Sequence, residues 1–307
     1  MTRVAAVDCG TNSIRLLVAD VDLDAAVLTD VDRRMEIVRL GEGVDRTGRF
    51  APAALERTFA ACGRYAEVIA TTGAERLRFV ATSASRDVAN RDDFVDGVRT
   101  ALGVDPEVVS GDEEAALSFA GATRELLGTD CRTPFLVVDI GGGSTELVLG
   151  DTSVQAARSI DIGCVRMTER DLHEDPPRPE QVAAARRDIE GGIAVAAESV
   201  PIQQAGTLVG LAGSVTTVAA MALDLPAYQP ERIHRSRVSA AEVRSVTSRL
   251  LAMTREERAA LPFMHPGRVD VIGAGALILA CVVDAVAADE VLVSEHDILD
   301  GIAWSLA

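Results

Sequence analysis

The chain has 307 residues and a formal charge of −17, from 47 acidic against 30 basic residues, and every basic residue is arginine. The absence of lysine excludes a P-loop lysine, a Schiff-base lysine and a lysine general base. The acidic balance argues against nucleic-acid binding, which needs a basic surface, so local arginines, backbone amides or a metal must hold any anionic ligand.

Apolar runs, turn residues and helical spacing predict an alternation of strands and helices in the first part of the chain. We expect strands at 3–9, 14–20, 26–32, 34–40, 77–82 and 107–109, and helices at 52–71, 91–102 and 112–128. Pro52 is suited to the first turn of its helix, and Asp112 is expected to cap the helix that follows it.

The second part repeats this pattern. We expect strands at 135–139, 145–149, 153–160, 207–211 and 290–294, and helices at 180–199, after 212–217, at 239–252, at 270–287 and at 297–306. Each part begins with a strand that ends in Asp, a turn of small residues and a second strand, which indicates a duplicated α/β unit. We predict domains over 1–128 and 129–307, with the terminal helix able to pack back on the first.

No segment indicates export or a membrane span. The N-terminal apolar run is interrupted by Asp8, and the longest apolar stretch, 271–283, has 13 residues where a span needs about 20. The five cysteines form no C-x-x-C pair, as expected of reduced thiols in the cytoplasm. The four histidines are far apart and show no zinc-binding spacing.

Two explanations of the lysine-free, acidic composition stay open. A strongly acidic surface is one adaptation to a high-salt cytoplasm. A GC-rich genome, in which arginine codons displace lysine codons, gives the same composition. Activity in low salt would argue against the first explanation.

The segment from Asp139 to Glu146 carries the strongest functional signal. A buried strand delivers Asp139 to its end, and the glycine turn exposes backbone amides that can bind an anion. Glu146 lies on the returning strand, and two carboxylates beside a phosphate suggest Mg²⁺ or another divalent cation. The phosphate-binding group is expected at Gly141, Gly142, Gly143 and Ser144. The alternative is a glycine-rich hairpin with surface acids, which leaves the triple glycine unexplained.

Two further turns follow the same logic. Thr11, Asn12 and Ser13 supply polar donors after the strand that ends at Cys9, and we interpret them as a second phosphate loop. Gly213 and Ser214 begin a helix, where anions bind readily. For that third turn alone, Ser214 as an ordinary N-cap is slightly favoured.

Other charged segments are ambiguous from the residues alone. The acids at 112–114 are more often helix-stabilising charges than a general base. Arg86 follows a strand end and serves equally well as a phosphate ligand or as a solvated arginine. The basic island Arg232, His234, Arg235 and Arg237 either guides a polyanion or pairs with nearby acids, and we slightly favour pairing.

The ordered motifs of the chain resemble one family. They are DCGTNS, RFVATSASRDVAN, VVSGDEEA, VVDIGGGSTELVLG, IDIGCVRMTE, GLAGSVTTVA, PGRVDVIGAGALIL and VSEHDILDG. Together they are similar to the exopolyphosphatase/guanosine pentaphosphate phosphohydrolase (Ppx/GppA) family, short two-domain type. The resemblance implies two ribonuclease-H-like α/β domains, as in actin and sugar kinases, with a cleft between them.

The resemblance also implies roles for single residues. The general base corresponds to Glu114, with Glu113 one alignment step away. Metal-associated acids fall on Asp139 and Glu146, and Arg86 matches a phosphate-contacting arginine. The phosphate loops correspond to Thr11, Asn12 and Ser13, and to Gly141, Gly142, Gly143 and Ser144. Thr11 stands where the family usually has serine, and ILDG replaces LREG near the C-terminus, which removes a basic residue.

We therefore expect a Mg²⁺-dependent exopolyphosphatase that forms a homodimer in the cytoplasm, with polyphosphate or guanosine pentaphosphate as substrate. The chain lacks the extra C-terminal helical domains of longer members, which favours short polyphosphate chains. Rivals are a sugar or carboxylate kinase, an actin-like filament or chaperone ATPase, and a weakly catalytic sensor of guanosine pentaphosphate.

Overall fold

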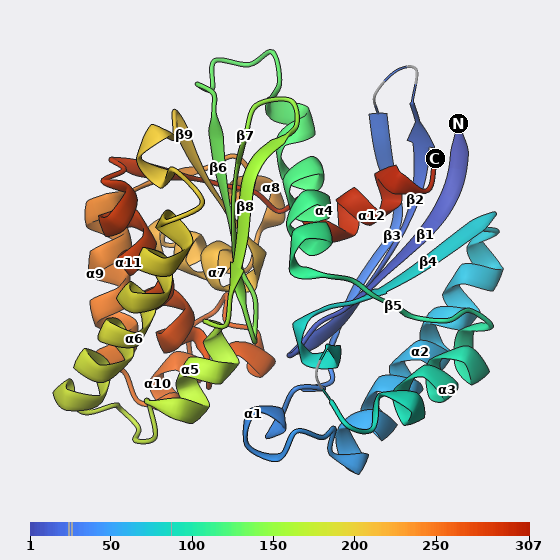
Figure 1. The fold of residues 1–307 in the computed structure, drawn as a ribbon, viewed down its shortest axis with the longest axis horizontal. Helices are drawn as coiled ribbons and strands as arrows, with labels where there is room; N and C mark the ends of the chain where they lie inside the picture. The colour runs from blue at the N-terminus through green and yellow to red at the C-terminus, as the bar shows by residue number, and fades with distance from the viewer. Residues whose placement is uncertain (24, 26, 87) are drawn as a thin grey trace. The chain divides into compact units, whose positions relative to one another are not determined.

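The computed structural model describes residues 1–23, 25, 27–86 and 88–307, which form two compact units, each built on one β-sheet (Figure 1). Unit 1 comprises residues 1–121 together with 298–307, and unit 2 comprises residues 122–297. Within the described ranges, no helix combines the length and the apolar character that crossing a bilayer requires.

Unit 1 contains a five-stranded sheet in the order β3-β2-β1-β4-β5. Its elements are β1 (Thr2–Cys9), β2 (Ser13–Asp22), β3 (Val27–Ile37), α1 (Val44–Thr47), α2 (Pro52–Thr72), β4 (Arg76–Ala81), η1 (Ser83–Ser85), α3 (Arg91–Leu102), β5 (Glu107–Val108), α4 (Gly111–Thr123, ending just inside unit 2) and α12 (Ile298–Ser305). Strands β1, β4 and β5 are parallel, whereas β2 and β3 are antiparallel to their neighbours.

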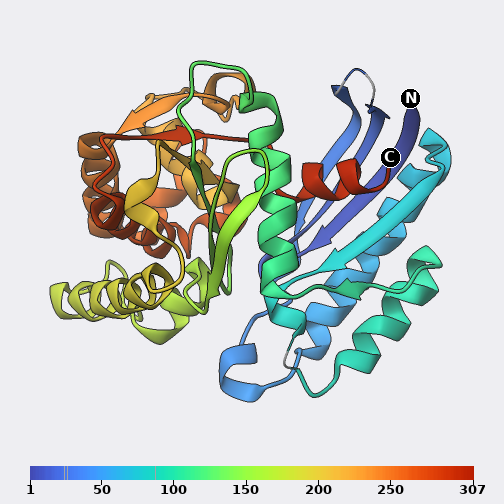
Figure 2. The same cartoon turned by 45° about the horizontal axis from the view of Figure 1, so that its top comes forward.

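Strand β1 is buried on both faces of the sheet. Because successive side chains of a strand point to opposite faces, alternate residues of β1 belong to two different cores. Ala5 and Val7 belong to the core that the sheet shares with α2 and α3. Val4 and Ala6 belong to a second core, which includes Ile302 of α12. Two views show α12 crossing β1 and β2 on the face opposite α2 and α3 (Figures 1 and 2).

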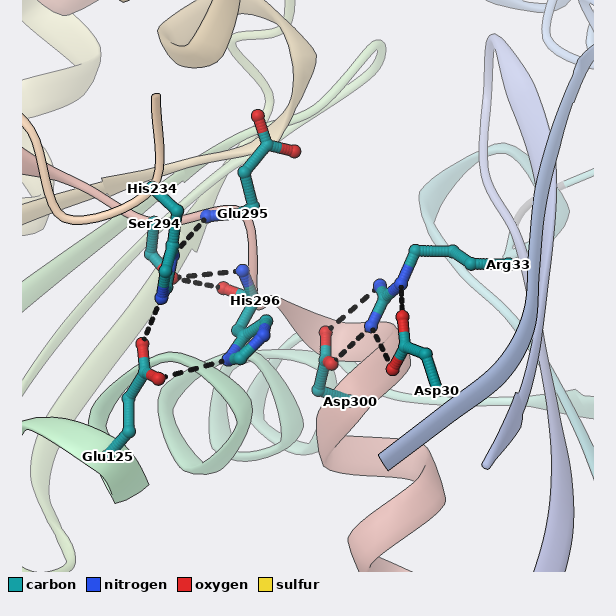
Figure 3. A network of polar contacts seen from close by, with 8 residues as sticks. All are labelled: Asp30, Arg33, Glu125, His234, Ser294, Glu295, His296 and Asp300. Carbon is teal, nitrogen blue, oxygen red and sulfur yellow. Dashed lines mark hydrogen bonds and ion pairs between the residues drawn. The ribbon is translucent and has the colours of Figure 1, made fainter. Parts of the chain in front are cut away.

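An ion pair fastens α12 to the edge strand β3. Arg33 of β3 donates to Asp300 of α12, with Nη2 2.5 Å from Oδ1, and also contacts Asp30 on its own strand (Figure 3). Asp300 is 2% exposed, so this carboxylate depends on Arg33 for charge compensation. The acid in the ILDG segment therefore has a structural partner in unit 1.

Unit 2 repeats the strand order of unit 1 with one extra edge strand, β8-β7-β6-β9-β11-β10. Its elements are η2 (Arg124–Leu126), β6 (Phe135–Ile140), β7 (Thr145–Gly150), β8 (Val154–Ile160), α5 (Cys164–Arg170), α6 (Pro179–Ala197), η3 (Ile202–Gln204), β9 (Thr207–Leu211), α7 (Ala212–Ala222), α8 (Pro230–Ile233), β10 (Arg237–Ser239), α9 (Ala240–Ala252), α10 (Arg255–Ala259), η4 (Pro266–Arg268), α11 (Ile272–Val286) and β11 (Glu290–Val293). The apolar helix α11 is almost wholly buried between α9, α6 and α7. The shared strand order confirms the predicted duplication and the two ribonuclease-H-like domains.

Three local predictions are wrong. The strands expected at 26–32 and 34–40 form one strand, β3. Strand β2 pairs with β3 along its length, and ion pairs on this exposed edge neutralise the central charges of β3. Residue 26 lies outside the described residues. Asp112 does not cap α4, because the Ser110 hydroxyl takes this role and accepts a hydrogen bond from the Glu113 amide at 3.2 Å. Ser214 lies inside the first turn of α7 and does not cap it.

Candidate active site

The first turn of unit 1, between β1 and β2, is held in shape by hydrogen bonds to its backbone carbonyl groups. The amide of Gly10 donates to the Ser13 carbonyl at 2.9 Å, and the segment after β3 donates to the carbonyls of Thr11 and Asn12 at 2.8–3.1 Å. A side chain at Gly41 would lie 2.2 Å from Thr11 Cγ2, so only glycine permits this close approach. The turn therefore has a fixed shape.

Three segments follow the parallel strands β1, β4 and β5 and meet at one edge of the sheet, because parallel strands end on the same side. The Thr11 hydroxyl lies 3.1 Å from the Ser83 hydroxyl. Arg86 donates to the Val109 carbonyl at 3.1 Å and forms a short ion pair with Glu114. Thr11, Arg86 and Glu114 are thus gathered at this edge, as neighbouring strand ends require.

The two candidate bases at the start of α4 differ in their surroundings. Glu113 has an exposed side chain that pairs with Arg78 at 2.7 Å. Glu114 is 8% exposed and contacts Arg86, a residue predicted to bind phosphate. Only Glu114 therefore lies with the predicted phosphate-binding groups of unit 1.

An ion pair with one buried member lies behind the first turn. Asp8 is 4% exposed and directly faces Arg15 across the β1–β2 ladder, with Arg15 Nη2 2.6 Å from Asp8 Oδ2. Removing one member of such a pair leaves a buried charge without compensation. The carboxylate that ends β1 therefore has an arginine partner on the returning strand.

The glycine turn of unit 2 is a close structural copy of the first turn. The Gly141 amide donates to the Ser144 carbonyl at 3.0 Å, the counterpart of the Gly10–Ser13 bond. The amides of Cys164 and Val165 donate to the carbonyls of Gly141 and Gly142, both at 2.9 Å. In each unit, the segment after the third strand thus fastens the carbonyl side of the turn.

The amide side of this turn is left open. Among the residues that the structure describes, no backbone carbonyl accepts a hydrogen bond from the amides of Gly142, Gly143 or Ser144. Gly163 approaches so closely that a Cβ there would lie 2.3 Å from the Gly142 carbonyl oxygen. Carbonyls that are engaged and neighbouring amides that are not form an anion-binding nest.

The two predicted metal acids face one another. Asp139 and Glu146 are direct partners in the antiparallel β6–β7 ladder, so their side chains lie on the same face of the sheet. They are 7% and 1% exposed, and the Ser159 hydroxyl donates to Glu146 at 2.7 Å. Oxygen ligands of this kind fit a divalent cation such as Mg²⁺.

Comparison with known proteins decides the family. The model of the Ppx/GppA phosphatase family matches residues 17–307. The chain belongs to this family. Exopolyphosphatase 2 of Mycobacterium tuberculosis is 54% identical over 318 residues, covering 100% of this chain and 99% of its own.

Solved structures agree with this membership. A protein described as exopolyphosphatase-like superposes with a TM-score of 0.95 at 43% identity, covering 99% of this Ppx/GppA chain and 98% of its own. The Aquifex aeolicus Ppx/GppA protein gives a TM-score of 0.81 at 28% identity, with 99% and 97% covered. These matches confirm the sequence-based assignment to the phosphatase family.

The third turn of this Ppx/GppA member adjoins the glycine turn, because Asp139 and Leu211 are register partners in the parallel β6–β9 ladder. Ala212 has a φ of 66°, a strained conformation of the kind that concentrates at functional sites. The Ser214 hydroxyl lies against Gly275 of α11, where a Cβ would be 2.1 Å from it. The Ser214 hydroxyl is therefore held against α11, and it also forms a hydrogen bond with the Cys164 thiol.

Arg268 is a residue of this phosphatase that the sequence analysis missed. Its guanidinium occupies the space beside Gly213, where a Cβ would lie 2.4 Å from Cζ, and it donates to Thr217 at 3.3 Å. Its Cζ lies 5.9 Å from the centre of the Tyr228 ring. The only sequence signal was an arginine after Pro-Gly, which does not reveal that η4 lies beside the third turn.

A half-buried acid lies near the third turn of this phosphatase. The Tyr228 hydroxyl is 2.8 Å from the Thr216 hydroxyl and donates to Glu295 at 2.7 Å. Burial raises the pKa of Tyr228 to about 12 and also raises the pKa of Glu295 above its usual value. Glu295 follows β11, and no local pattern marked it in the sequence.

Proposed function

We propose that this chain hydrolyses terminal phosphoanhydride bonds of inorganic polyphosphate and releases orthophosphate. The observation that supports this most directly is the glycine turn of unit 2, with its carbonyls engaged and its amides open to an anion. A relative 54% identical over the full length is named an exopolyphosphatase. Backbone amides bind phosphate without any contribution from net charge, which explains how an acidic chain accepts a polyanion.

Each group has a defined task in this proposal. The amides of Gly142, Gly143 and Ser144 bind the phosphoryl oxygens, and Thr11, Asn12 and Ser13 supply further donors. Glu114 orients the attacking water and accepts its proton, since a carboxylate can act as a general base. Arg86 holds Glu114 before substrate binds and offers its remaining N–H groups to phosphate. Phosphoryl transfer needs mainly this positioning and charge stabilisation.

We propose Mg²⁺ as the cofactor, held by Asp139 and Glu146. When bound, the ion would neutralise charge on the transferred phosphoryl group. Two facing carboxylates with low exposure support the assignment, because Mg²⁺ prefers oxygen ligands of this kind. Phosphate release measured in EDTA and then in a series of divalent ions tests the choice of metal.

The deciding experiment compares phosphate release from polyphosphate, guanosine pentaphosphate and ATP under one set of conditions. We expect the highest kcat/KM with polyphosphate. Preference for guanosine pentaphosphate would transfer the proposal to that substrate. ATP hydrolysis alone, or no release from any of the three, would contradict it.

We also propose a homodimer in the cytoplasm, following the family resemblance. Light scattering coupled to size-exclusion chromatography tests the oligomeric state directly. A monomer at micromolar concentration would contradict the dimer without affecting the proposed reaction.

A further inference from the structure

Three side chains of unit 2 that are far apart in the sequence meet at one point. Glu125 belongs to η2, His234 follows α8 and His296 follows β11. His234 Nε2 lies 2.7 Å from one oxygen of Glu125, and His296 Nδ1 lies 3.5 Å from the other (Figure 3). Their potential ligand atoms all lie within 4.8 Å of one another.

We propose that Glu125, His234 and His296 form a binding site for a divalent transition-metal ion, with Zn²⁺ as the best-matched ion. Two imidazoles and one carboxylate suit zinc, and three protein ligands leave a fourth position for water. Mg²⁺ is disfavoured at this point because it prefers oxygen ligands in an octahedral arrangement. The site is therefore chemically distinct from the Asp139–Glu146 pair.

The distances are compatible with this assignment. In a tetrahedral site with bonds of about 2.0–2.1 Å, neighbouring ligand atoms lie about 3.3 Å apart. His296 Nδ1 is already close to this separation from one carboxylate oxygen of Glu125, and His234 Nε2 would move away from the other oxygen by a fraction of an ångström. Their side chains are 21–38% exposed, so an ion can reach them from solvent.

Backbone contacts hold the ligands in place without an ion. Ser294 accepts the His296 amide at 3.0 Å and donates to the His296 carbonyl at 2.8 Å. The Arg235 amide donates to the Val293 carbonyl at 2.7 Å, which ties the segment of His234 to the end of β11. The two imidazole rings lie 4.6 Å apart between their centres. The arrangement is thus largely formed in advance.

Two neighbouring groups moderate the affinity. The Glu295 amide donates to His234 Nδ1 at 3.2 Å, so the proton of the neutral ring is on Nε2, facing Glu125. On metal binding, Nε2 loses this proton and Nδ1 gains one, and the Glu295 contact is given up. Arg235 also acts electrostatically on Glu125, and its positive charge opposes the approach of a cation. Both effects should weaken metal binding.

Two of the three proposed ligands lie close to the ends of unit 2, so metal binding should affect the stability of the fold. Unit 1 passes into unit 2 after Gly121, four residues before Glu125, and unit 2 ends at Asp297, next to His296. One ion would bind both of these segments to the loop that carries His234. Metal binding should accordingly raise the melting temperature of the folded chain.

The test is a titration of EDTA-treated full-length protein with Co²⁺ and Zn²⁺ in excess Mg²⁺, which occupies oxygen-only sites. We expect one equivalent of Co²⁺ to give the visible absorption bands of a tetrahedral ion, and Zn²⁺ to displace it. Substitutions Glu125→Gln, His234→Gln and His296→Gln should each weaken Zn²⁺ binding by at least roughly 10-fold. His173→Gln, at a histidine elsewhere in unit 2, should leave the affinity unchanged.

Two results would overturn the proposal. One is the absence of tetrahedral Co²⁺ bands in the unmodified protein, which needs no variant and so does not depend on how a variant folds. The other is a Zn²⁺ affinity equal to that of the unmodified protein in all three variants, provided that each variant has a native circular-dichroism spectrum. In either case the three residues form only a hydrogen-bonded cluster. Neither result bears on the phosphatase activity, because no substrate is present.

Discussion

At the scale of single residues, burial separates groups that look alike in the sequence. Glu113 and Glu114 are adjacent acids in the first turn of one helix, yet one pairs with Arg78 at the surface and the other contacts Arg86 in a buried position. A helix turns by about 100° per residue, so neighbouring side chains cannot face the same way. The candidate base is selected by this geometry.

The substitution Glu114→Gln tests the base directly. The amide keeps the shape of the side chain but cannot accept a proton from water, so we expect kcat to fall by roughly 10²–10⁴-fold with little change in substrate binding. Steady-state phosphate release and isothermal titration with polyphosphate measure the two quantities. Glu113→Gln is the matched control and should keep near-normal turnover. Near-normal turnover of Glu114→Gln would remove Glu114 from the mechanism.

The half-buried acid Glu295 predicts a pH effect on stability. Its pKa is raised in the folded protein by burial, so folding favours the protonated form. Its stabilising contribution is complete below the unfolded value of about 4.5 and is lost as the pH rises through the folded pKa. Relative to the native chain, Glu295→Gln should therefore gain stability between pH 4.5 and neutrality.

Melting temperatures of both proteins across this pH range measure the effect. The exposed Glu198, changed to Gln, serves as control and should follow the native chain at every pH. A difference between Glu295→Gln and the native protein that does not vary with pH would show that Glu295 does not titrate as stated.

At the scale of elements, the two predicted phosphate turns are shaped by what lies on their carbonyl side. In unit 2 the start of α5 donates to Gly141 and Gly142, and Gly163 permits that approach. This helix was not predicted, because the seven residues of α5 carry too short a pattern for helical periodicity. The glycine turn was predictable, whereas its support was not.

Gly163→Ala should displace the backbone of the glycine turn of unit 2. The added methyl group would lie 2.3 Å from the Gly142 carbonyl oxygen, so the turn must shift. A misplacement of about 1 Å in a catalytic site costs roughly 10²-fold in rate, and we expect kcat/KM to fall by that order. Gly191→Ala in α6 is the control, since a methyl group added there would have open space around it.

The control should retain full activity and gain up to about 1 kcal/mol of stability from helix propensity. Equal activity of Gly163→Ala and Gly191→Ala would mean that the turn tolerates displacement and that its amides do not position substrate.

At the scale of the whole molecule, the charge of −17 opposes the approach of a polyanion. Salt screens this repulsion, with a Debye length of about 10 Å at 0.1 M. We expect kcat/KM for polyphosphate, at fixed free Mg²⁺, to rise as salt is added from low concentration. Initial rates over a salt series measure this, and a phosphoanhydride of smaller negative charge serves as the comparison. A steady fall from the lowest salt would contradict the expectation.

The sequence by itself determined the local framework of this protein. Alternating apolar runs and turn residues act over a few positions, so β1, β2, β6, β7, α2 and α3 were predictable, as were the two turns of small residues that follow β1 and β6. The long edge strand β3 was not, because its continuity depends on pairing with β2 and on ion pairs.

Only the tertiary structure decided which distant residues meet. Arg268 lies beside Gly213, and Glu125 joins His234 and His296, although these residues are far apart along the chain. The four histidines showed no metal-binding spacing, since spacing detects ligands on one element, whereas these ligands come from three segments. Sheet register and helix packing bring such segments together, and neither is encoded in a local pattern.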